Sequence, residues 1–164
     1  MNGLRESLRE CEDTIFERWM ADTLAVYPDE GARAFAREQN RFANPVGHSL
    51  RVGIRTIVTA LLDGNDQESI RRSLNDILQI RAIQQLTPAT AVGFLFCLKA
   101  LIRDTLGKKD GRFVAELAEL DRRIDQAALM AFDLYVAHRE RVYELRLNEV
   151  KRTIPWFAGK VDRG

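Results

Sequence analysis

The stretch that decides the fold is residues 112–153, RFVAELAELDRRIDQAALMAFDLYVAHRERVYELRLNEVKRT. It contains neither proline nor glycine, and its apolar residues recur at alternating steps of four and three, the spacing of one helix face. These residues are Phe113, Leu117, Leu120, Ile124, Ala127, Ala131 and Leu134. About 40 residues of helix span about 60 Å, which exceeds the width of a compact domain of this size. We therefore predict a long C-terminal helix over 112–153 that kinks or projects to pack on another chain, followed by a short tail, 154–164.

The apolar stripe of this helix predicts a homodimer. The interface candidates are Leu120, Ile124, Ala127, Ala131, Leu134 and His138. His138 continues the stripe, where a polar residue can set the register of a helix pair and can titrate near neutral pH, unless the stripe reaches solvent there. Beyond the helix, Trp156 and Phe157 are expected to form an apolar tip for docking.

Proline and glycine divide the preceding chain into shorter helices. A first helix over 3–26 places Leu4, Leu8, Cys11, Ile15 and Trp19 on one face and stops at Tyr27-Pro28. A second, over 29–42, carries Ala32, Phe35 and Ala36. Asn44 and Pro45 then read as the cap and first residue of a third helix, which Asp63-Gly64 ends.

Two further helices follow before the long one. Asn65 and Glu68 predict a capping box for a fourth helix that ends near Leu86. Thr87-Pro88 repeats the cap-plus-proline pattern for a fifth, which is apolar nearly all round and should be the most buried. No segment shows strand-like alternation. We therefore expect one all-α domain over 1–164, a helical bundle of about six helices with a long C-terminal helix.

Composition excludes several classes of protein. The 164 residues suit one domain, and 25 basic against 24 acidic side chains argue against a nucleic-acid partner. No apolar run is long enough to predict a membrane span, and the charged N-terminus is not a signal peptide. Cys11 and Cys97 lie in apolar helical patterns, so we expect reduced core thiols and a cytoplasmic protein.

The sequence contains few residues and no motifs of the kinds that catalysis requires. His48 and His138 are the only histidines, and neither follows a glutamate by three residues as di-iron bundles require. There is no HExxH, Walker loop or GxGxxG motif. We therefore predict no catalytic residues, no metal site and no enzyme. His48, in the first turn of the third helix, could still ligate heme, although a lone histidine is more often packed or exposed.

The sequence alone does not decide the role of Arg81. It falls in the middle of the apolar stripe of the fourth helix, so it must be paired or reach an anion or solvent. One reading is a structural contact with a carboxylate or with helix C-terminal carbonyls, and the other is a pocket donor for a polar ligand. Trp19, Phe42 and Phe94 could wall such a pocket or could be plain core. Three glycines lie inside the predicted helices, where a missing side chain would allow another helix or a ligand to approach closely. They are Gly47, Gly53 and Gly93.

Three segments together resemble a known family. They are Trp19 with Tyr27-Pro28, then Phe42-Ala43-Asn44-Pro45-Val46-Gly47, then Ile80-Arg81-Ala82 leading into Thr87-Pro88-Ala89-Thr90-Ala91-Val92-Gly93-Phe94. Over roughly residues 5 to 140, the chain resembles the N-terminal domain of RsbRD-type RsbT co-antagonist proteins, which are related to the RsbR proteins of the stressosome.

The resemblance implies a bacterial sensory or regulatory domain of globin-like fold, without bound heme, that dimerises through its last helices. In that family a long helix carries the signal to an output domain, usually a STAS domain. This sequence ends at Gly164 without room for one, so we expect a stand-alone sensor that acts on a separate signalling protein. The alternative is a globin-like protein that binds heme or a small ligand, with Arg81, Trp19, His48 and Phe94 as pocket candidates.

Overall fold

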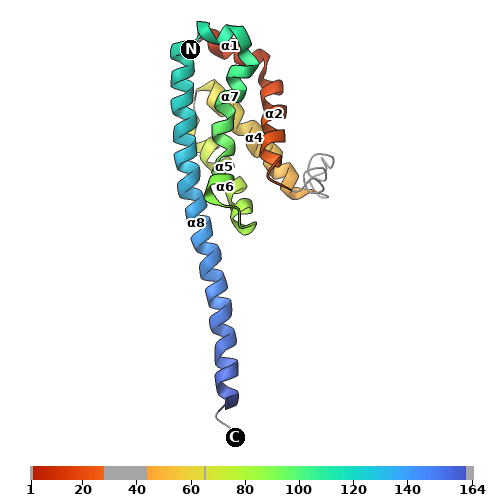
Figure 1. Ribbon diagram of the computed structural model, residues 1–164, viewed down its shortest axis with the longest axis vertical. Helices are drawn as coiled ribbons and strands as arrows, with labels where there is room; N and C mark the ends of the chain where they lie inside the picture. The colour runs from red at the N-terminus through yellow and green to blue at the C-terminus, as the bar shows by residue number, and fades with distance from the viewer. Residues whose placement is uncertain (1, 28–43, 65, 162–164) are drawn as a thin grey trace.

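The structure is a computed structural model that describes residues 2–27, 44–64 and 66–161. Helices pack side by side around one core, and the last helix runs far past the others (Figure 1). The predicted all-α bundle with a long C-terminal helix is confirmed. The helix predicted over 29–42, with Ala32, Phe35 and Ala36, lies outside the described residues, as does Phe42. No helix of the described part is long and apolar enough to cross a membrane.

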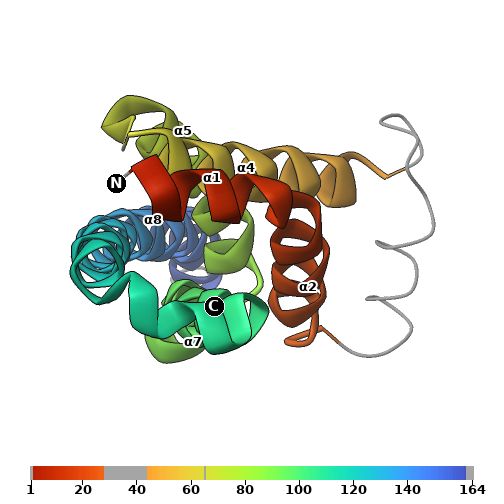
Figure 2. The same ribbon diagram turned by 90° about the horizontal axis from the view of Figure 1, so that it is seen from above.

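The first predicted helix is two helices. α1 spans Asn2–Glu10 and α2 spans Glu12–Leu24, with a break at Cys11 (φ −109°, ψ 4°). Figure 2 shows the two helices meeting at a sharp angle. Leu4 and Leu8 on α1 and Ile15 and Trp19 on α2 are all buried, so the predicted face is the core-facing one and the break lets it wrap around the core.

The next two helices pack against each other. α4 spans Pro45–Asp63, capped by Asn44, whose Oδ1 accepts from the Gly47 amide at 2.9 Å, and it ends at Gly64 in a positive-φ conformation (143°). α5 spans Gln67–Ile83. Its cap is Asp66, which accepts from the Ser69 amide at 3.1 Å, so the predicted Asn65 cap was one residue early.

The predicted fifth helix is also broken. α6 spans Pro88–Val92 and α7 spans Phe94–Leu106, on either side of Gly93, and a 3₁₀ helix, η1, covers Gly107–Arg112. The first half of this helix, expected to be the most buried because it is apolar nearly all round, leaves Phe96 51% exposed and Cys97 exposed as well. The expected burial of both cysteines is therefore wrong: Cys97 is exposed and Cys11 is half-buried.

The last helix, α8, spans Val114–Val161. Its 48 residues correspond to about 72 Å of helix. The first part lies along the body formed by α1 to α7, and the rest projects alone (Figure 1). The helix continues past Thr153, where the prediction ended it, and Pro155 lies within its span.

The core-facing stripe of α8 corrects the predicted dimer interface. Leu120, Ile124, Ala127 and Ala131 are at most 3% exposed, because they pack into the core of their own chain. Leu134 is half-buried against the same core. Periodicity identifies an apolar face but not what covers it, and here the body of the same chain covers it.

Candidate functional site

Arg81 lies in the core and binds backbone carbonyls. Its side chain is fully buried, and its two terminal nitrogens donate to three oxygens. Nη1 donates to the carbonyls of Ala91 at 2.8 Å and Thr90 at 3.2 Å, and Nη2 donates to that of Thr23 at 3.0 Å. Of the two readings of Arg81, the contacts match the one with helix C-terminal carbonyls.

These contacts explain the break before α7. In a continuous helix, the carbonyls of Thr90 and Ala91 would accept from amides four residues ahead. Arg81 takes them instead, and the third carbonyl, that of Thr23, belongs to the last turn of α2. One guanidinium therefore caps the ends of two helices. Burial lowers the pKa of Arg81 below its usual value, while the charge interaction with the nearby Tyr27 opposes that shift.

Trp19 and Phe94 complete this buried cluster. Their rings stack with centroids 5.5 Å apart, and the Trp19 Nε1 donates to the Phe94 carbonyl at 2.7 Å. The Arg81 guanidinium lies 4.5 Å from the centre of the Phe94 ring. Arg81, Trp19 and Phe94, three of the four pocket candidates, therefore lie together and pack against one another. Neither the groove beside His48 nor the groove beside Tyr143 is lined by Arg81, Trp19 or Phe94.

His48 does not join the cluster. It lines an open surface groove of about 320 Å³ between α4 and α5, with Ser49, Val52, Ser73 and Asp76 among its neighbours. No group of three or more histidine, cysteine or acidic side chains that could hold a metal ion occurs among the residues that the structure describes.

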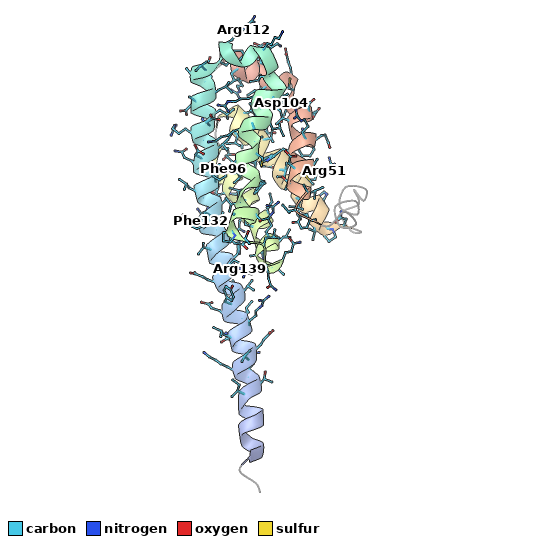
Figure 3. All side chains as sticks on the ribbon, viewed as in Figure 1. Arg51, Phe96, Asp104, Arg112, Phe132 and Arg139 are labelled. Atoms are coloured by element: carbon cyan, nitrogen blue, oxygen red, sulfur yellow. The ribbon has the colours of Figure 1, made fainter. Side chains whose placement is uncertain are left out.

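The junction between the body and α8 is the second notable site. Tyr135 donates its hydroxyl to the carbonyl of Leu86, and His138 Nε2 lies 3.0 Å from Oδ1 of Asn75. Arg139 donates from Nη1 to the Ala82 carbonyl at 3.0 Å, which holds the C-terminal turn of α5. Figure 3 shows Arg139 at the level where the body ends. His138 is thus a contact between α8 and α5 within one chain.

A second apolar stripe runs along the outside of α8. Its residues are Leu129, Phe132, Val136, Tyr143, Leu147, Val150 and Ile154. Except for the half-buried Val136, each has about half or more of its surface exposed. At 100° per residue, these side chains lie within an arc of about 60°, on the side of the helix opposite the core-facing stripe. We call this set the outer stripe.

The outer stripe begins beside the body and continues along the projecting part. Phe96 of α7 and Phe132 of α8 lie on neighbouring helices (Figure 3). Further along, a groove of about 420 Å³ separates α8 from the turn that holds Gln85 to Pro88, and Val136 and Tyr143 line it. Sequence reasoning missed the outer stripe, although its steps of three and four residues are the same signal that revealed the inner one.

Comparison with known proteins gives one match. A family model described as the RsbT co-antagonist protein rsbRD N-terminal domain matches residues 13–150. No curated protein and no solved structure matches the chain. The matched segment runs from α2 into the projecting part of α8 and covers well over half of the 164 residues, which confirms the resemblance. The chain therefore belongs to the RsbRD N-terminal domain family, a family of regulatory co-antagonist domains.

Proposed function

We propose that this chain is a non-enzymatic sensory or regulatory domain of a bacterial signalling system. It acts in the cytoplasm as a homodimer and relays a signal through α8 to a separate signalling protein. The observation that carries the proposal is the outer stripe, an exposed apolar face with helical spacing that extends beyond the body of the domain.

The position of the outer stripe supports both association and relay. A helix in water with a continuous apolar face gains free energy when another surface covers that face. The outer stripe starts at Leu129, where the inner face of α8 is still packed in the core, and reaches Ile154, far beyond it. A partner helix bound to the stripe therefore contacts α8, and the first part of α8 is packed in the body. The family description, co-antagonist, agrees with action on another protein.

Two leucines test this proposal. Leu147 belongs to the outer stripe and is 57% exposed, and Leu145, which is 59% exposed, points about 160° away. In light scattering at high micromolar concentration, we expect the wild type and Leu145→Asp to be dimers and Leu147→Asp to be a monomer with unchanged helix content.

A monomeric wild type would overturn the proposed dimer, and dissociation by Leu145→Asp alone would move the interface to the other face. The proposal assigns no cofactor. A Soret band after purification with added heme, lost in His48→Ala, would favour the heme-binding alternative instead.

A further inference from the structure

The groove beside Tyr143 lies at the level where α8 leaves the body, between α8 and the turn of Gln85 to Pro88 (Figure 3). Its volume of about 420 Å³ falls within the range of about 300–1,000 Å³ that is usual for small-molecule sites. Its lining is mostly apolar and includes Leu86, Pro88 and Val136. The groove therefore has the size and the surface of a site for a small organic molecule.

Contacts within the chain hold both walls of this groove in place. The hydroxyl of Tyr135 on α8 donates to the carbonyl of Leu86 in the turn. On the side of the turn, the Thr87 hydroxyl accepts from the Thr90 amide at 3.2 Å. Gln85 has a φ of 60°, and among the residues that the structure describes it is the only one other than glycine with a positive φ. Such backbone strain persists where surrounding contacts fix it and recurs at ligand sites, so we regard the groove as preformed.

Two opposite charges line the groove, and neither has a charged partner. Glu140 is exposed, and its carboxylate takes part in no hydrogen bond or ion pair within the part of the chain that the structure describes. Arg139 donates to the Ala82 carbonyl and to the Tyr143 hydroxyl, which are both uncharged. Those two bonds leave further N–H donors of the guanidinium unused, together with its full positive charge. Consecutive residues of α8 therefore offer a ligand one anion and one cation.

We propose that this groove binds a free α-amino acid with an apolar side chain. Such a molecule carries a carboxylate and an ammonium group on one carbon, so it complements Arg139 and Glu140 together. A simple acid or a simple amine is attracted by one of these residues and repelled by the other. The apolar side chain packs against Val136 and Pro88, and an aromatic ring can also stack on the half-exposed ring of Tyr143.

This inference rests on the proposed function, because it names the class of molecule that the domain senses. A ligand in the groove touches the body through Leu86 and the long helix through Val136. Val136 and Tyr143 also belong to the outer stripe, so the ligand borders the surface through which the chain is proposed to associate. A difference in affinity between the associated and free states would let the ligand shift that equilibrium.

Isothermal titration calorimetry of the full chain with L-phenylalanine tests the inference. We expect saturable binding of one molecule per chain. Glu140→Gln should weaken this binding by about tenfold or more, because the ammonium group loses a charged hydrogen-bond partner. Glu144→Gln, one turn further along α8 and outside the groove, is the matched control and should keep the affinity within about twofold. Phenethylamine and 3-phenylpropanoate, which each lack one of the two charges, should bind about tenfold or more weakly than L-phenylalanine.

Several results would overturn the inference. They are the absence of binding at millimolar L-phenylalanine, equal binding of phenethylamine or 3-phenylpropanoate, and an unchanged affinity in Glu140→Gln. Amide NMR shifts locate the ligand: they should cluster at Leu86, Val136 and Tyr143, and shifts confined to other residues place the site elsewhere.

Light scattering separates this inference from the proposed function. A dimer that binds no amino acid keeps the proposed association and loses the amino-acid site. A monomer that binds L-phenylalanine in the groove loses the proposed dimer and keeps the site.

Discussion

Replacing Arg81 with methionine tests whether this residue holds the fold. Methionine keeps most of the length of the side chain but loses the three hydrogen bonds to the carbonyls of Thr23, Thr90 and Ala91. A hydrogen bond to a charged group contributes about 1.5–3 kcal/mol. Methionine also avoids the cost of burying a charge, and this offsets several kcal/mol of the free energy lost with the three hydrogen bonds. We therefore expect Arg81→Met to lower the free energy of unfolding by about 3 kcal/mol, because three carbonyls that are buried or partly buried are left without partners at about 1–3 kcal/mol each.

Arg72 supplies the matched control on the same helix. Its side chain is 75% exposed and pairs with Glu68 one turn away, so Arg72→Met should cost no more than about 0.5 kcal/mol. Urea unfolding followed by circular dichroism measures both variants. The protein concentration must be held fixed, because association of a dimer adds stability that depends on concentration. An Arg81→Met variant within about 1 kcal/mol of the wild type would refute the structural role and return Arg81 to the reading as a ligand donor.

Two further predictions concern packing and pH. A Cβ on Gly53 would lie 3.1 Å from Cδ1 of Ile77, so Gly53→Leu should destabilise the chain by about 2 kcal/mol and lower Tm by roughly 4–8 °C. Val52→Leu, on the exposed side of the same helix, is the control and should leave Tm unchanged. Equal Tm values for the wild type and both variants would contradict the close approach of α4 and α5. Hydrogen bonds from Arg122 and Arg123 lower the pKa of Glu119 from 4.5 to about 2, so its contribution to stability is complete above pH 4.5 and is lost as the pH falls toward 2. A carboxyl NMR titration measures this pKa, and the double variant Arg122→Gln/Arg123→Gln should return it toward 4.5.

Local signals predicted most helix boundaries well. Asn44 and Thr87 cap their helices through their side chains, and Gly64 and Gly107 end helices with positive φ angles. These features depend on residues a few positions apart, so the sequence contains the whole interaction. The cap at Asp66 was missed by one residue because Asn65 is an equally suitable type.

Features that depend on distant residues could not be predicted in the same way. The helix predicted after Thr87 is broken because Arg81, from another helix, takes two of its carbonyls. Arg81, Trp19 and Phe94 were candidates for a ligand pocket or for plain core, and the choice depends on packing that only the fold determines. The inner stripe of α8 was assigned to a second copy for the same reason: periodicity records that a face is apolar and is silent about which surface covers it.

The end of α5 connects these two parts of the molecule. Arg81 reaches inward from this turn to the ends of α2 and α6, while the carbonyl of the next residue, Ala82, accepts outward from Arg139 of α8. Arg139 also donates to the hydroxyl of Tyr143, at 2.8 Å, and stacks on its ring. Tyr143 belongs to the outer stripe. A shift of the α2 or α6 ends therefore has a short, continuous route through two neighbouring residues of α5 to the surface on which α8 is proposed to pair. Under the proposed relay, this contiguity makes the α5 C-terminus, rather than the histidines, the expected route of a signal into the long helix.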